Sequence, residues 1–126
     1  MRVDGIAWHA LVLQPAAFRE MEDFVEKTLG LHALTQDEGR RLYLMRNGTM
    51  LDLYAPWAVP PYGFNEGTAF GFQVDDLEKA SKTAVAAGHT LLGAVTTIGG
   101  LNYAIQHFRG PDGRVYGLSE VQAIDW

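Results

Sequence analysis

The chain has 126 residues, a formal charge of −5 at neutral pH and 48% hydrophobic residues. That length and apolar content fit one compact domain with a substantial core. The ten Lys and Arg residues form no basic stripe, which argues against nucleic acid as a partner. The chain has no Cys, which excludes disulfides, thiolate nucleophiles and Cys-based metal sites.

The long uncharged stretch does not indicate a membrane protein. Residues 83–108 contain no Asp, Glu, Lys or Arg, but repeated Gly, Asn102 and Gln106 favour strands and turns over a spanning helix. The apolar run at residues 5–17 is interrupted by His9 and predicts a strand instead of a secretion signal. We therefore expect a cytoplasmic protein without a membrane partner.

The first half of the chain predicts a strand, a helix and a hairpin. Residues 5–13 form the strand candidate, and Pro15 starts a helix with apolar residues at helical spacing: Phe18, Met21, Val25 and Leu29. Gly30 ends this helix as its C-terminal cap. A histidine-containing segment, "LHALTQ" at 31–36, then leads into a two-stranded hairpin.

The second half repeats this order. Residues 70–74 predict a strand, Asp75-Asp76 caps a helix, and the helical face is Leu77, Ala80, Ala84 and Ala87 before Gly88. The two Gly caps are 58 residues apart (88 − 30). This period predicts a single α+β domain, 1–126, of two βαβββ modules at about 1–55 and 68–126, with a Pro-rich connector at about 56–67.

The first hairpin, "RLYLMRNGTMLDLYAP" at 41–56, carries a lone acid among apolar residues. Asn47-Gly48 predicts a two-residue turn, which pairs Tyr43 with Asp52. Because side chains alternate, one face would then present Tyr43, Met45, Met50, Asp52 and Tyr54. A carboxylate among apolar and aromatic groups is typical of a small-molecule site.

The second hairpin contains Gly110-Pro111-Asp112-Gly113, a turn sequence. A four-residue loop pairs Gln106 with Gly117. Gly117 then holds the place that Asp52 has in the first module. In this register His107 and Glu120 point away from the cavity face.

Together these features resemble the vicinal oxygen chelate superfamily of glyoxalases, extradiol dioxygenases, and bleomycin and fosfomycin resistance proteins. The matching stretches occur in the expected order: "IAWHALVL", "FREMEDFVEKTLGL", "GTMLDLYAP", "AFGFQVDDLEKASKTAVAAGH" and "FRGPDGRVYGLSE". The resemblance implies two βαβββ modules curled into a half-barrel around a cavity, with helices outside. It also implies a homodimer.

In metal-using members, the resemblance places ligands on the opening and closing strands of each module. The equivalent residues here are His9, Asp52, Ala69 and Gly117. His9 and Asp52 can ligate a divalent ion, but Ala69 and Gly117 cannot. Two ligands are fewer than the three protein ligands of a typical catalytic site. The prediction is no metal and no cofactor, with a divalent metal at His9 and Asp52 as the alternative.

The first functional hypothesis is a small-molecule-binding protein of the glyoxalase/bleomycin-resistance type, holding an aromatic or antibiotic-like ligand without a metal. Tyr62 and Phe64 of the connector would help cover an edge of the cavity. The predicted ligand-binding residues are His9, Leu11, Tyr43, Met45, Met50, Asp52, Tyr54, Trp57, Ala69, Gln73, Gln106 and Gly117.

Two alternatives remain open. The protein could be a lyase, isomerase or dioxygenase-related enzyme in which His9 and Asp52 hold a metal or act as an acid–base pair. It could instead be a non-catalytic interaction module whose cavity is filled by its own side chains. In that case Trp57 and Trp126 would cover a surface or form a dimer contact.

Overall fold

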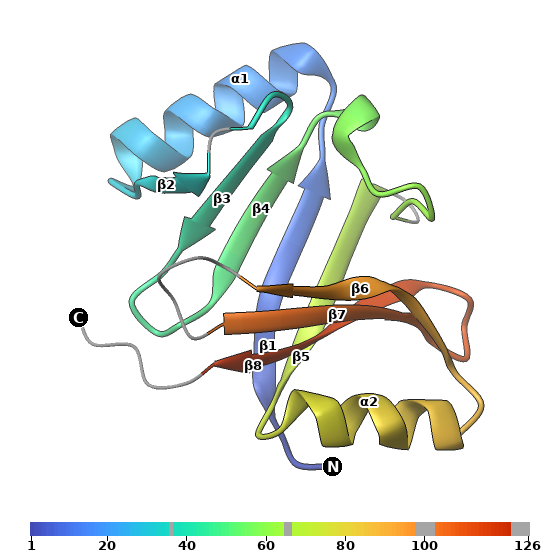
Figure 1. Ribbon diagram of the computed structural model, residues 1–126. Helices are drawn as coiled ribbons and strands as arrows, with labels where there is room; N and C mark the ends of the chain where they lie inside the picture. Colours follow the sequence, from blue (N-terminus) through green and yellow to red (C-terminus); the bar gives the residue numbers. More distant parts are fainter. Residues whose placement is uncertain (36, 65–66, 98–102, 122–126) are drawn as a thin grey trace.

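The computed structural model describes residues 1–35, 37–64, 67–97 and 103–121. The first half contains β1 (Val3–Val12), α1 (Pro15–Asp23), the π-helical turn η1 (Phe24–Thr28), β2 (Ala33–Thr35), β3 (Arg40–Leu44) and β4 (Met50–Tyr54). The short 3-10 helix η2 (Pro56–Ala58) follows. The second half contains β5 (Thr68–Val74), α2 (Leu77–Ala86), β6 (Thr90–Thr97), β7 (Tyr103–Arg109) and β8 (Val115–Val121). The predicted α+β fold of two βαβββ modules is confirmed (Figure 1).

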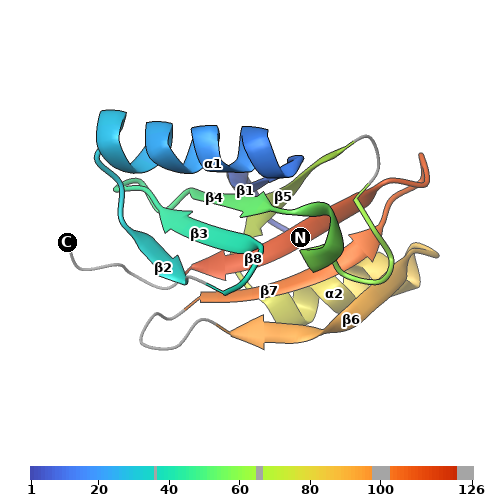
Figure 2. The same ribbon diagram turned by 90° about the horizontal axis from the view of Figure 1, so that it is seen from above.

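The described strands form one eight-stranded sheet in the order β2-β3-β4-β1-β5-β8-β7-β6. Within each half the first and last strands are parallel, β1 with β4 and β5 with β8. The antiparallel pair β1–β5 joins the two halves at the centre. The sheet curls into a half-barrel, and α1 and α2 lie on its outer side (Figures 1 and 2).

Helix α1 begins where the sequence predicts. Pro15 occupies the first turn, where its fixed φ suits a helix and its missing N–H costs no hydrogen bond. Phe18 and Val25 are buried against the outer side of the sheet. The chain widens into the π-helical turn η1 after Asp23, which rotates the residues that follow. Leu29, predicted on the buried face, is therefore 51% exposed.

Helix α2 follows its predicted cap closely. The Asp76 side chain accepts a hydrogen bond from the Lys79 backbone N–H at 3.0 Å. Leu77 and Ala80 are buried against Val74 and Leu118 of the sheet. Ala87 lies beyond the helix end and is exposed, contrary to the prediction that it lies on the packed face.

The predicted two-residue turn of the first hairpin is wrong. The Met45 backbone N–H donates to the Thr49 carbonyl at 2.8 Å, and Gly48 N–H donates to the Met45 carbonyl at 3.0 Å. The loop therefore has three residues, with Gly48 in the left-handed region at φ 87°. A left-handed Gly at the last position is typical of such three-residue loops. Asp52 consequently pairs with Leu42, not with Tyr43.

The second hairpin repeats the same geometry. Gly110 N–H donates to the Arg114 carbonyl at 2.9 Å, and Gly113 N–H donates to the Gly110 carbonyl at 3.0 Å. Gly113 has φ 81°. The predicted four-residue loop is therefore wrong by one residue, and Gly117 pairs with His107 instead of Gln106.

Each one-residue shift places the side chains of one hairpin strand on the face of the sheet opposite to the predicted one. The inner face of the half-barrel carries a core that includes Trp8, Leu42, Met50 and Tyr54. Tyr43 instead packs beneath α1 on the outer face. No helix within the described ranges is long and apolar enough to cross a membrane.

Candidate functional site

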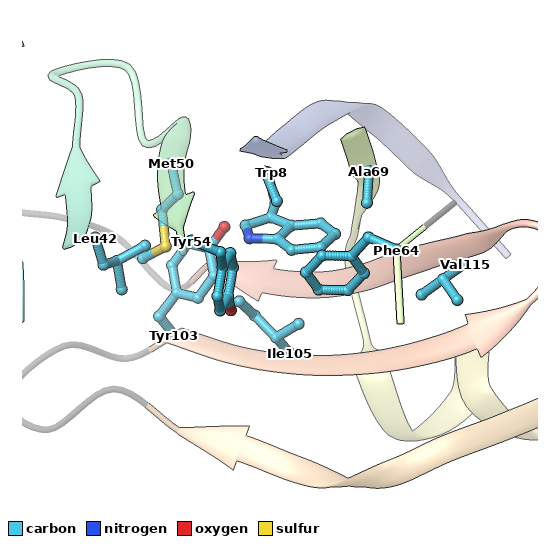
Figure 3. Packing of buried hydrophobic residues seen from close by; sticks show 10 residues of the cluster. Trp8, Leu42, Met50, Tyr54, Phe64, Ala69, Tyr103, Ile105 and Val115 are labelled. Atoms are coloured by element: carbon cyan, nitrogen blue, oxygen red, sulfur yellow. The ribbon is translucent and has the colours of Figure 1, made fainter. Parts of the chain in front are cut away.

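Trp8 lies at the centre of the inner face. Its side chain is 1% exposed and contacts core residues from both halves (Figure 3). Phe64 packs edge-on against the indole, with ring centroids 5.5 Å apart. His107 lies over the same indole at 4.9 Å with a tilt of 32°. Strand β1 has a register irregularity between Ile6 and Trp8, and the adjacent Ala7 and Trp8 are both buried.

Small residues make room for this indole. A methyl group built on Gly117 would lie 3.2 Å from the Trp8 ring and 3.7 Å from His107. Behind it, a methyl group on Gly71 would lie 2.9 Å from the Gly117 backbone, so β5 and β8 also need Gly to approach each other. Ala69 is part of the same inner core. Trp8 therefore occupies space that larger side chains at Ala69 and Gly117 would require.

Asp52 is the centre of a buried hydrogen-bond network. Its carboxylate is fully buried and accepts two hydrogen bonds from Arg40, from Nε and Nη2, each at 2.9 Å. Trp8 Nε1 donates to the carboxylate at 3.1 Å, and the Tyr54 hydroxyl donates at 3.3 Å. A buried carboxylate requires this kind of pairing, because an unpaired buried charge is strongly destabilising.

This network fixes the charge states around it. Burial alone would lower the pKa of Arg40, but the hydrogen bonds and charge of Asp52 outweigh burial and raise that pKa above its ordinary value. Burial raises the pKa of Tyr54, and the negative charge of Asp52 raises it further. The guanidinium also lies over the Tyr54 ring at 5.2 Å. Arg40 therefore stays cationic and Tyr54 stays a neutral phenol.

His107 and Tyr62 form a second polar pair at the inner face. The Tyr62 hydroxyl is hydrogen-bonded to Nδ1 of His107. Burial lowers the pKa of His107 to about 4, and the nearby positive charge of Arg40 contributes. Burial also raises the pKa of Tyr62. At neutral pH the pair is an uncharged imidazole bonded to an uncharged phenol.

These two polar pairs line one cavity of about 150 Å³. The wall contains a charged pair, two tyrosines and one imidazole, together with indole, proline and small aliphatic surface. The lining residues are Trp8, Arg40, Asp52, Tyr54, Pro60, Tyr62, Ala94, Thr96, Ile105 and His107. We call this space the half-barrel cavity.

Several predicted site residues lie elsewhere. His9 and Leu11 alternate with Trp8 and therefore lie on the outer face, where His9 is exposed and Leu11 packs near α1. Tyr43 lies beneath α1, and its hydroxyl donates to Glu26 at 3.0 Å. Gln106 lies beneath α2, because the register of the second hairpin is shifted. The prediction that these four side chains face the cavity is wrong.

Other predicted residues lie nearer but do not form the cavity wall. Met50 and Ala69 belong to the inner core, and Gly117 backs the Trp8 ring. By alternation Gln73 shares the inner face, where it pairs with Ser119. Met45 lies at the hairpin turn. None of these five is among the residues that line the half-barrel cavity.

Three aromatic residues of the connector are predicted to help form the cavity. One of them lies outside it, and two lie at it. Trp57 is 63% exposed, and its indole lies beside Gly39 outside the cavity. Tyr62 lines the cavity, and Phe64 packs against Trp8 at its border. The predicted role of Trp126 lies outside the described residues. Of the twelve predicted ligand-binding residues, Asp52 and Tyr54 line the half-barrel cavity.

The sequence interpretation missed Trp8, Arg40 and His107. The signal that could have found Arg40 and His107 is the position of Gly48 and Gly113, each the fourth residue of a turn. Three-residue loops would have placed Arg40 opposite Tyr54 and His107 opposite Gly117. Trp8 could have been favoured over His9 because an indole gains more from burial than an imidazole.

The residues present do not fit a catalytic divalent ion. The carboxylate of Asp52 already accepts hydrogen bonds from three side chains, one of them a guanidinium. Trp8, Ala69 and Gly117 supply no metal ligand. No group of three or more His, Asp or Glu residues that could hold a metal ion is found within the described parts of the chain. The alternative of a metal at His9 and Asp52 fails because the two side chains lie on opposite faces.

The fold and site define a paired βαβββ protein with a half-barrel cavity. Residues 8–115 match the model of the Glyoxalase/Bleomycin resistance protein/Dioxygenase superfamily, and the chain belongs to this family. No curated protein matches the chain in sequence.

Solved structures share the fold at low identity. Methylmalonyl-CoA epimerase from Mycobacterium tuberculosis matches with a TM-score of 0.62 and 18% identity, over 96% of this chain and 90% of the epimerase. A superfamily member from Vibrio splendidus 12B01 matches with a TM-score of 0.56 and 13% identity, over 96% and 100%. Homoprotocatechuate 2,3-dioxygenase from B. fuscum matches with a TM-score of 0.66 and 17% identity, over 98% of this chain and 34% of the dioxygenase. At these identities the likeness concerns the fold alone.

The Asp52 network predicts a large stability loss for Asp52→Asn. The substitution leaves the Arg40 guanidinium partly buried without its counter-charge, so the free energy of unfolding should fall by about 3 kcal/mol. Urea unfolding measures this change. The matched control Asp23→Asn breaks the exposed Asp23–Lys27 pair and should change stability by less than about 0.5 kcal/mol. Equal effects of the two substitutions would contradict a structural role for Asp52.

The lowered pKa of His107 predicts a specific pH dependence. In the unfolded chain His107 takes up a proton below about pH 6.5, whereas in the folded protein its pKa is about 4. As the pH is lowered from about 6.5 to about 4, the free energy of unfolding should therefore fall by up to about 3 kcal/mol. His107→Gln and His107→Phe should both flatten this dependence in urea unfolding at several pH values. A slope equal to that of the unmodified protein in both variants would show that His107 does not titrate this way.

Proposed function

We propose that the half-barrel cavity binds a compact, neutral organic molecule directly, without a metal or cofactor. The observation that carries this proposal is the pairing of Arg40 with Asp52 on one wall of a cavity that also presents aromatic surface. Polar groups fix a ligand's orientation and apolar groups supply most of the burial, which is the usual composition of a small-molecule site.

Cavity size limits the ligand. Typical ligand sites have volumes of about 300–1,000 Å³, whereas this cavity has about 150 Å³. A space of that size accommodates about one aromatic ring. An antibiotic-sized molecule would have to extend beyond the cavity mouth. We therefore propose a single-ring compound, or the ring of a larger molecule, in place of a fully enclosed drug.

The charge of the wall selects the polar group of the ligand. Arg40 and Asp52 neutralise each other, so a carboxylate or an ammonium group would bring an uncompensated charge into the cavity. The bidentate contact uses Nε and Nη2 of Arg40, and Nη1 has no hydrogen-bond partner among the described residues. A carbonyl oxygen can accept from this N–H without adding charge. The proposed ligand is therefore an aromatic ketone, ester or amide.

A second copy of the chain is also part of the proposal. Between the two helices, the outer face presents His9, Phe70 and Tyr116 at matching positions of β1, β5 and β8. Phe70 is 37% exposed and Ile6 47%. Exposed apolar surface of this kind favours a homodimer. We propose a homodimer that acts in the cytoplasm.

An enzymatic role is the second candidate, carried by the hydrogen bond between Tyr62 and His107. In the tautomer with the proton on Nδ1, His107 donates to the Tyr62 oxygen. Nε2 can then remove a proton from carbon, and the phenol O–H can donate a hydrogen bond to the developing oxyanion. His107 and Tyr62 would act in place of the predicted acid–base pair, His9 and Asp52, whose side chains lie on opposite faces of the sheet. The similar structures include an epimerase and a dioxygenase by name, so the fold also serves catalysts.

Direct binding can be tested with acetophenone on protein stripped of metal by EDTA. The indole N–H signal of Trp8, identified with Trp57→Phe and Trp126→Phe, should shift saturably in a two-dimensional NMR spectrum. Acetophenone should bind about tenfold more tightly than ethylbenzene, which lacks the carbonyl, and than benzoate, which adds a charge. Thr96→Phe should fill the cavity and abolish the shift. Tight binding that appears only after metal is returned would contradict the proposal.

The enzyme candidate makes a separate prediction with the same ligand. In D2O, a base that acts beside the bound carbonyl would exchange the methyl protons of acetophenone for deuterium, whereas binding alone would not. Proton NMR follows this exchange, and His107→Gln should remove it if His107 is the base. Exchange at the solvent rate in the unmodified protein would leave binding as the function and exclude this catalytic role for acetophenone.

A further inference from the structure

A second and larger hollow lies on the opposite side of the sheet. It has a volume of about 690 Å³ and is formed between α2 and the outer face of β6 and β7. Six residues define its walls and floor: Leu77, Ser81, Val85, Leu91, Val95 and Gln106. We call it the α2 groove. Its volume is within the range of small-molecule sites.

Two buried polar groups in the α2 groove have unused hydrogen-bonding capacity. The Ser81 side chain is 9% exposed, and its hydroxyl has no hydrogen-bond partner in the described parts of the chain. Gln106 is 6% exposed, and its amide nitrogen donates to the carbonyls of Gly93 at 2.7 Å and Leu92 at 3.4 Å. The amide oxygen of Gln106 has no partner among the described residues. Buried polar atoms are almost always paired, so the unpaired Ser81 hydroxyl, together with the accessible amide oxygen of Gln106 in the same groove, points to a polar group of a bound molecule.

The charges at the edge of the α2 groove indicate the sign of that polar group. Glu78 and Glu120 border the groove. Lys82, which also lines it, is hydrogen-bonded to Glu78 at 3.1 Å. Glu120 has no ion-pair partner within the described parts of the chain. The groove therefore presents one uncompensated carboxylate and mainly hydrogen-bond acceptors, which complement a cationic donor.

We propose that the α2 groove binds a lipophilic amine, with its hydrocarbon part between Val85 and Val95 and its ammonium group facing Gln106 and Glu120. Apolar burial supplies attraction, and the ammonium group supplies donors for the unused oxygens. This site is separate from the half-barrel cavity, since the two hollows lie on opposite faces of β6. Its chemistry is also different, because the half-barrel cavity favours a neutral carbonyl compound.

Strand β6 offers a matched pair of variants. Val95 lines the α2 groove, and the next residue, Thr96, lines the half-barrel cavity. Both are exposed, so a larger side chain at either position fills one hollow without replacing a core residue. Val95→Phe therefore blocks the groove alone, and Thr96→Phe blocks the cavity alone. Ala86→Phe, from the exposed side of α2, is a second way to fill the groove.

In the test, n-hexylammonium, n-hexanol and n-hexanoate are each titrated into the protein, and backbone amide NMR measures binding. The amine should shift signals of residues 77–86, 91, 95 and 106, and should bind about tenfold more tightly than the carboxylate. Val95→Phe and Ala86→Phe should each weaken amine binding about tenfold or more, whereas Thr96→Phe should not change it. Glu120→Gln should weaken the amine about fivefold and leave hexanol unchanged.

Three outcomes would overturn this inference. The first is no saturable shift with the amine in a protein whose circular dichroism shows it folded. The second is equal or tighter binding of hexanoate, which would contradict the charge argument. The third is binding that Thr96→Phe removes and both groove variants leave intact, which would place the amine in the half-barrel cavity.

Discussion

The buried carboxylate of Asp52 is the constraint on which the inner face of this protein depends. A charge at the centre of a half-barrel must be paired, and here Arg40 supplies the counter-charge while Trp8 and Tyr54 supply further donors. The network joins β1, β3 and β4. It also directs the Trp8 indole across the centre of the barrel, where Gly117 and Ala69 leave space for it. The carboxylate thus holds the first module together.

This arrangement underlies the proposal that the family fold binds a ligand here without a metal. The position on β1 that faces Asp52 carries an indole, and the corresponding places in the second module carry a methyl group and a hydrogen. The indole fills the centre of the barrel, and the methyl group and the hydrogen leave the space that the indole needs. What remains open is a cavity of about 150 Å³, bordered by the neutralised Arg40–Asp52 pair and by the uncharged His107–Tyr62 pair. Such a site can recognise shape and a single acceptor group.

The sequence predicts the architecture well because its signals are local and repeated. Pro15, Asp76, Gly30 and Gly88 start or end the two helices where expected. The repeat of strand, helix and hairpin then determines the two modules and the family.

The site is harder to predict, because it depends on register, and one residue of loop length decides which side chains face inward. Asn47-Gly48 and Pro111-Asp112-Gly113 are compatible with more than one loop length in isolation. In the fold both close three-residue loops, and Arg40 and His107 face the cavity. His9 and Trp8 are adjacent, and only packing decides that the indole is inside. Asp52 and Tyr54 line the cavity because β4 has the alternation that the sequence predicts.

In this structure the Asp52 carboxylate is a structural anchor whose oxygens are occupied by protein donors, which leaves it no role as a metal ligand. A crystal structure of protein soaked with Mn²⁺, with anomalous scattering measured, tests this most directly. Arg40 and Trp8 should lie within hydrogen-bond distance of Asp52, and no anomalous peak should lie beside its carboxylate. A peak at bonding distance from Asp52, with Trp8 or Arg40 displaced, would contradict it.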